Sequence, residues 1–93
     1  MIKTFGDKNT ERLFLEGRSK KVPSEVLDRA IRKLDMIDAA NCVDDLHVPP
    51  GNRLHALMGD RAGQYSISIN SQWRICFCFE AGDAFEVELC DYH

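Results

Sequence analysis

The hydrophobic residues of this 93-residue chain change their period near the middle, and that change constrains the fold more than any other feature. Residues 24–40 carry apolar side chains at i, i+3 and i+4 spacing, which indicates a helix packed on a core. From Arg53 onward apolar and polar residues alternate, which indicates strands with one buried face. A helical part followed by a strand-rich part predicts an α+β fold with an antiparallel sheet.

Local signals give the bounds of two N-terminal helices. Asp7 can cap a helix that runs to about Glu16, and Gly17 can end it in the left-handed conformation. Pro23 favours the start of the second helix. The core stripe of that helix comprises Leu27, Ala30, Ile31, Leu34 and Ile37. Residues 2–5 also alternate, and they predict a short strand before both helices.

The second part of the chain predicts a meander of antiparallel strands. The run Pro49-Pro50-Gly51-Asn52 stops any helix, and strands are expected over residues 53–58, 64–70, 73–80 and 85–90. We expect the two helices to pack on one face of this sheet and the other face to stay partly open. No linker or repeat interrupts the pattern, so residues 1–93 are expected to form one domain. Arg74, Cys76 and Cys78 alternate with the apolar residues of their strand, which makes the open face the expected place for a site.

Composition excludes several classes of protein. No apolar run approaches the roughly 20 residues of a membrane span, and the first residues lack the apolar stretch of a secretory signal, so a cytoplasmic protein without membrane contact is expected. The four cysteines are too few and too irregularly spaced for a disulfide framework. A zinc-binding module is a weak alternative because no paired Cys or His motif occurs. No glycine-rich phosphate loop or nucleophile elbow is present, and we expect no cofactor and no metal.

Charge is divided unevenly along the chain. Residues 1–40 hold 9 Lys and Arg against 7 Asp and Glu, whereas residues 41–93 hold 3 against 8. The net charge of −3 argues against indiscriminate binding to duplex DNA. A local basic surface remains possible, as does an ordinary solvated helix face. Its members would be Arg18, Lys20, Lys21, Arg29, Arg32 and Lys33.

The sequence ends in Asp91-Tyr92-His93, which places a carboxylate, a phenol and an imidazole next to one another. The fold could bring this group to the same surface as His55 and Arg74. Cleavage of RNA without a metal requires a base for the 2′-hydroxyl, a cation for the phosphorane-like transition state and an acid for the leaving oxygen. Histidine, tyrosine and arginine can perform these tasks. Two simpler interpretations stay open, since His55 could be a hydrogen-bonded packing residue and Arg74 could pair with Glu86 or Glu88.

Five segments together resemble the HigB-like plasmid-maintenance killer proteins of the RelE toxin superfamily. They are Met1-Ile2-Lys3-Thr4-Phe5, the run from Pro49 to Leu57, Gly59-Asp60-Arg61-x-Gly63, Asn70-x-x-Trp73-Arg74-Ile75-x-Phe77 and the terminal Asp91-Tyr92-His93. The resemblance spans nearly the whole chain. It implies the RelE-like microbial RNase toxin fold and a toxin that cuts messenger RNA on the ribosome.

The resemblance also implies partners and site residues. A HigA-like helix-turn-helix antitoxin would hold the toxin inactive, and operator DNA would be contacted only through that complex. The catalytic residues carried over are His55, Arg74, Asp91, Tyr92 and His93. Many relatives carry a lysine in place of Met58 and an arginine in place of Cys78, which predicts a weak or conditional nuclease. The alternative is a catalytically degenerate toxin that binds the antitoxin and acts as a co-repressor.

Overall fold

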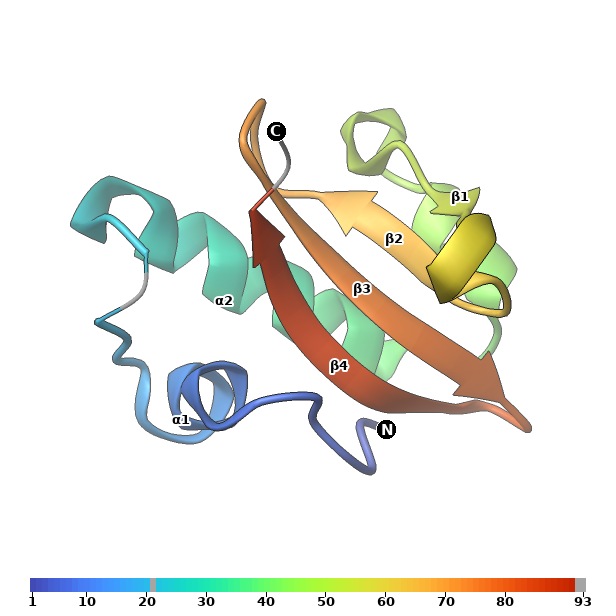
Figure 1. Ribbon diagram of the computed structural model, residues 1–93, viewed down its shortest axis with the longest axis horizontal. Helices are drawn as coiled ribbons and strands as arrows, with labels where there is room; N and C mark the ends of the chain where they lie inside the picture. Colours follow the sequence, from blue (N-terminus) through green and yellow to red (C-terminus); the bar gives the residue numbers. More distant parts are fainter. Residues whose placement is uncertain (21, 92–93) are drawn as a thin grey trace.

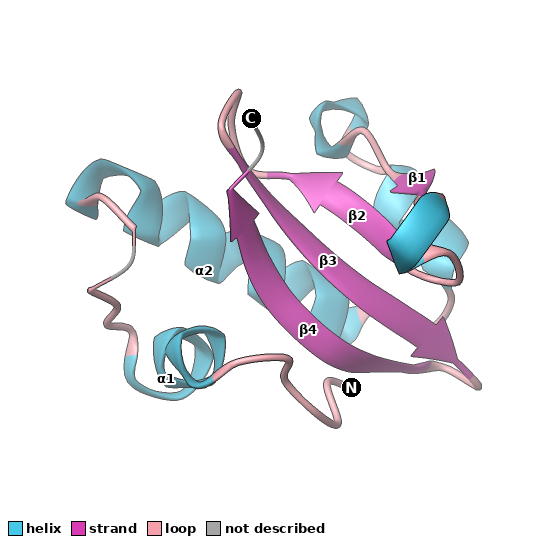
Figure 2. Ribbon diagram, in the orientation of Figure 1, coloured by secondary structure: helices cyan, strands magenta, loops and turns pink. Residues whose placement is uncertain are grey.

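The computed structural model describes residues 1–20 and 22–91. Two helices precede a four-stranded antiparallel sheet in which the strands lie in chain order, and α2 crosses behind that sheet (Figure 1). The regular elements are α1 (Lys8–Glu16), α2 (Ser24–Ala39), β1 (His55–Ala56), β2 (Tyr65–Ser68), β3 (Trp73–Glu80) and β4 (Asp83–Asp91). Three short 3₁₀ turns span Val43–His47, Pro50–Asn52 and Gly59–Arg61. The expected α+β class, with helices on one face of an antiparallel sheet, is confirmed (Figure 2).

Both helices begin and end close to the predicted residues. The side chain of Asp7 accepts a hydrogen bond from the Thr10 amide at 3.1 Å, and Gly17 ends α1 with a φ of 73°. Pro23 directly precedes α2, as predicted. A cap and a left-handed glycine act within a few residues of the chain, so a sequence can show them without knowledge of tertiary contacts.

The core lies between α2 and the face of the sheet toward it. The fully buried side chains on α2 are Ala30, Leu34 and Ile37, and those on the sheet include Ile67, Ile75, Phe77 and Val87. Leu27 and Ile31, which the stripe included, are only half-buried, whereas Val26 is buried. The side of α2 that faces the sheet therefore includes Val26 and leaves Leu27 and Ile31 partly exposed, so it differs slightly from the predicted stripe.

Residues 2–5 do not form a regular strand, and this expectation was wrong. They make two isolated parallel bridges to β4, between Ile2 and Ala84 and between Phe5 and Val87. The register of β3 and β4 shifts between Cys76 and Cys78, and Glu86 there has a φ of 54°. Such a bulge interrupts a ladder, so the N-terminal segment makes separate bonds on either side of it instead of one continuous strand.

The loop before β1 is organised by one buried side chain. Asn52 is fully buried, and its amide donates to the carbonyls of Leu46 at 3.1 Å and Val48 at 3.3 Å. Its side-chain oxygen accepts a hydrogen bond from Lys33 on α2. Because Arg53 follows with a φ of 48°, the chain turns sharply, and β1 is shorter than the strand expected over residues 53–58.

In the described ranges, no helix is long and apolar enough to cross a membrane.

Candidate active site

Arg74 lies on the open face of the sheet, in the middle of a set of acceptors. Its Nε donates to the hydroxyl of Ser66 at 3.0 Å, on the neighbouring strand β2. One terminal nitrogen lies 3.2 Å from the carbonyl oxygen of Arg53 and 3.1 Å from Nδ1 of His55. The side chain is only 9% exposed. The guanidinium is therefore held in one orientation on this face of the sheet.

His55 comes to Arg74 through the pairing of β1 with β2. His55 is directly opposite Ser66, so both residues face the same side of the sheet as the arginine. Nδ1 of His55 lies 3.2 Å from the Arg53 carbonyl as well as 3.1 Å from Arg74. It can accept from the guanidinium or donate to the carbonyl, but it cannot do both at once. The first choice places the ring proton on Nε2, and the second leaves Nε2 free to accept a proton.

Asp91 is the last residue of β4 and is exposed. It pairs with Trp73, so the register assigns it to the face opposite Arg74, and its carboxylate accepts a 3.4 Å hydrogen bond from Gln72. Cys90, one residue earlier, is the residue opposite Arg74. Of the five predicted catalytic residues, the structure thus brings His55 and Arg74 into contact and puts Asp91 at the adjoining strand end. Tyr92 and His93 lie outside the described residues.

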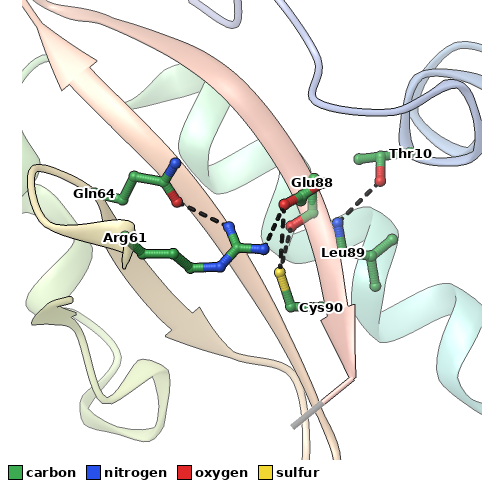
Figure 3. A network of polar contacts seen from close by, with 6 residues as sticks. All are labelled: Thr10, Arg61, Gln64, Glu88, Leu89 and Cys90. Carbon is green, nitrogen blue, oxygen red and sulfur yellow. Dashed lines mark hydrogen bonds and ion pairs between the residues drawn. The ribbon is translucent and has the colours of Figure 1, made fainter. Parts of the chain in front are cut away.

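A second polar group on the same face involves Arg61 and Glu88. Arg61 donates to the Glu88 carboxylate at 2.7 Å and to the side-chain oxygen of Gln64 at 3.0 Å (Figure 3). The hydrogen bond that Arg61 donates to Glu88 is the main reason why the pKa of Arg61 is raised. Glu88 was a possible partner of Arg74 on the sequence pattern, and its short ion pair is instead with Arg61. This group joins the turn after β1 to the far strand of the sheet.

Two thiols lie between these polar groups. Cys76 is opposite Glu88, and Cys90 is opposite Arg74, which makes the two cysteines diagonal neighbours across β3 and β4. A hydrogen bond from the Cys90 thiol lowers the pKa of Cys76 to about 7 and raises that of Cys90. Arg61 and Arg74 lower the pKa of Cys76 further by their charge, against the opposing effect of burial. Within residues 1–20 and 22–91, no three His, Cys, Asp or Glu side chains are grouped as a metal site would need.

Sequence reasoning missed the acceptors that orient Arg74. Ser66 belongs to the alternating pattern of β2, and its place on the polar side was a usable signal. The Arg53 carbonyl had no such signal, since any residue carries one, and only the left-handed turn at Arg53 directs it to the guanidinium. Met58 is 87% exposed, so the position where relatives were expected to carry a lysine is open to solvent.

Sequence comparisons give close relatives over the whole chain. Residues 3–93 match the family model described as the RelE-like toxin of the type II toxin–antitoxin system HigB. "Endoribonuclease HigB" of Proteus vulgaris is 40% identical over 93 residues, which is 100% of both chains. "Toxin HigB-1" of Vibrio cholerae is 37% identical over 90 residues and covers 96% of this chain and 95% of that protein.

Solved structures agree with the fold at much lower identity. A mutant of YafQ from E. coli superposes with a TM-score of 0.64 at 10% identity and covers 98% of this chain and 91% of that one. The protein HP0894 from Helicobacter pylori gives a TM-score of 0.59 at 16% identity, over 98% and 94% of the two chains. Because the family model and both close relatives span almost every residue, the chain belongs to the HigB-like, RelE-type toxins of type II toxin–antitoxin systems.

Proposed function

We propose that this toxin is an endoribonuclease that cleaves messenger RNA on the ribosome by acid–base catalysis. The observation that carries the proposal is the contact of Arg74 with His55, 3.1 Å apart on the open face of the sheet. A permanent cation beside an imidazole suits attack of a 2′-hydroxyl on the adjacent phosphorus. The products are a 2′,3′-cyclic phosphate and a free 5′-hydroxyl.

Arg74 is proposed to bind the scissile phosphate. Its guanidinium stays charged at any working pH and offers several donors in a fixed plane. Ser66 and the Arg53 carbonyl already hold that plane, so little reorganisation is needed when negative charge grows on the phosphate oxygens. A side chain can thus supply the stabilisation that a metal ion supplies elsewhere.

His55 is proposed to carry a proton, with its tautomer coupled to the phosphate. When Nδ1 of His55 donates to the Arg53 carbonyl, it no longer accepts from Arg74, whose donors are left for the phosphate. Nε2 then has an unshared pair and can remove the proton of the 2′-hydroxyl. The imidazolium, with a proton on each ring nitrogen, is the form that can protonate the leaving 5′-oxygen from Nε2.

The terminal motif is proposed to complete the site. His93 would take the proton-transfer role that His55 does not, Tyr92 would stabilise the transition state, and Asp91 would orient its neighbours. The family assigns an antitoxin partner to this chain. We propose that the antitoxin is a HigA-like helix-turn-helix protein, that operator DNA is bound only through their complex, and that the toxin acts in the cytoplasm, where translation takes place.

A second candidate function is favoured by the exposed Met58. If that position lacks a phosphate contact that relatives make, the loss costs about 1.5–3 kcal/mol, or roughly 10- to 150-fold in binding or rate. A toxin so weakened could remain in the genome as an antitoxin-binding co-repressor. Replacement by lysine distinguishes the two, because Met58→Lys should increase cleavage only in a chain whose catalytic groups are otherwise complete.

The test is cleavage of a defined messenger RNA on purified ribosomes, followed by primer extension. Wild type is compared with Arg74→Ala and His55→Ala. The control is Arg18→Ala, which replaces an exposed arginine just after α1. Loss of the cation or of the base should lower the rate by about 10²–10⁴-fold. The Arg18 variant should retain the wild-type rate. Intact messenger RNA with wild type, alongside tight antitoxin binding, would reject the nuclease and favour the co-repressor.

A further inference from the structure

We propose that a basic groove beside the candidate active site binds the sugar–phosphate backbone of the RNA substrate strand on one side of the scissile phosphate. The groove lies between α2, the loop at Gly51 and the turn that joins β2 to β3. It consists of two adjoining hollows of about 370 and 320 Å³, which share Arg29, Gly51 and Ile69. This proposal rests on the proposed nuclease function and adds the path of the strand.

Four cations line the groove: Arg29, Arg32 and Lys33 on α2, and Arg53 at the other end. Arg29 donates to the carbonyl of Ile69 at 3.2 Å, and Lys33 donates to the side chain of Asn52. Both acceptors are neutral. The partners therefore hold the cations in place without cancelling their charge, which is the arrangement that binding of an anion needs.

Across the described part of the chain, no ion pair joins any of these four cations to a carboxylate, and neither hollow is lined by Asp or Glu. The pKa of Lys33 is lowered by burial and by the charges of Arg29 and Arg32. A protein with a net charge of −3 therefore keeps a site where like charges repel one another and a polyanion would relieve that repulsion.

The groove continues into the candidate active site. Arg53 is one of the residues that line the second hollow, and its carbonyl oxygen accepts a hydrogen bond from Arg74 at 3.2 Å. Ser68, in the same hollow, is the residue opposite Arg74 in the pairing of β2 with β3. A strand whose phosphate binds Arg74 can thus place neighbouring phosphates along the groove. Single-stranded nucleic acid fits because its repeated charges match a row of cations.

The experiment measures binding without cleavage. A short, fluorescein-labelled oligonucleotide with 2′-O-methyl groups throughout has no 2′-hydroxyl to react, and its anisotropy reports affinity for the full chain. Wild type is compared with Arg32→Gln, with Arg32→Gln/Lys33→Gln, and with the control Arg18→Gln/Lys20→Gln. The control removes the same charge from exposed residues beside a separate hollow between α1 and α2. The single Arg32 variant keeps the hydrogen bond from Lys33 to Asn52, so its effect on binding does not come from loss of that bond. Thermal unfolding verifies that each variant is folded.

We expect the groove variants to bind about tenfold more weakly for each lost contact, and the control to bind as wild type. The slope of log affinity against log salt should fall by about 1.4 in the double groove variant, since each phosphate contact to a single strand contributes about 0.7. Equal losses in groove and control variants would assign the effect to net charge and overturn the proposal. Loss of antitoxin binding with unchanged oligonucleotide affinity would assign the groove to the antitoxin and overturn it too. Because the probe cannot be cut, failure of the nuclease function and failure of the groove give different results.

Discussion

The hydrogen bond between Ser66 and Arg74 is open to a direct energetic test. Ser66 is fully buried and Arg74 nearly so, and the Nε to Oγ distance is 3.0 Å. A hydrogen bond to a charged group in such a setting contributes about 1.5–3 kcal/mol. Neither single substitution measures it. Ser66→Ala removes the acceptor of a buried N–H, whereas Arg74→Met also removes the cost of burying a charge.

A double-mutant cycle isolates the pair. Free energies of unfolding in urea are measured for wild type, Ser66→Ala, Arg74→Met and the double variant, and we expect a coupling of about 1.5–3 kcal/mol. Ser68 provides the control, because it is opposite Arg74 in the ladder but its hydroxyl donates to the Asn70 carbonyl at 3.0 Å. The Ser68→Ala cycle with Arg74→Met should be additive. A Ser66 coupling below about 0.5 kcal/mol would refute the view that this hydroxyl holds the guanidinium.

Three further predictions concern Cys76, Gly17 and Asn52. Alkylation of Cys76 by iodoacetamide, measured by mass spectrometry, should increase with pH and reach half its maximum near pH 7. The reason is that only the thiolate reacts and that the pKa of the Cys76 thiol is about 7. In Cys90→Ala, the midpoint should move up toward the ordinary value of 9.0. Gly17→Ala should lower the free energy of unfolding by about 1 kcal/mol because φ is 73°, whereas Gly51→Ala, where an added Cβ meets nothing, should change it little. Asn52→Ala should cost about 2–3 kcal/mol, measured by urea unfolding, because it leaves two carbonyls of the loop before β1 without their donor.

Each of these predictions has a result that contradicts it. An unchanged Cys76 midpoint in the Cys90 variant would mean that the thiol–thiol hydrogen bond does not set its acidity. Equal losses at Gly17 and Gly51 would remove backbone conformation as the cause. A neutral Asn52 substitution would show that solvent replaces the lost donors, which its full burial argues against.

Part of the fold was predictable because its causes are local. The cap at Asp7 and the left-handed Gly17 act within one turn of helix, and α1 begins and ends accordingly. The alternating residues of β3 and β4 define which face is buried, since a strand has a fixed period of two. Residues 2–5 have the same alternation, yet they bridge β4 at two isolated positions, because the bulge at Glu86 prevents a continuous ladder.

The candidate site was likewise predictable from the sequence only in part. Arg74 and His55 were predictable from residue type and from the resemblance to the toxin family, because charge and titration belong to the side chain itself. Their contact was not predictable, since it depends on the register of β1, β2 and β3, which brings residues 19 apart in sequence to 3.1 Å.

By itself, therefore, the sequence determined the helix ends, the buried face of β3 and β4 and the chemistry available to the open face. Only the tertiary structure decided which groups meet there: Ser66 and the Arg53 carbonyl on Arg74, and Glu88 on Arg61. It also placed two adjoining hollows lined by cations beside them. The physical reason is the range of the interactions. Propensity, capping and period act over a few neighbouring residues, whereas hydrogen bonds and ion pairs join whatever side chains the packing of distant elements brings within about 3 Å of one another.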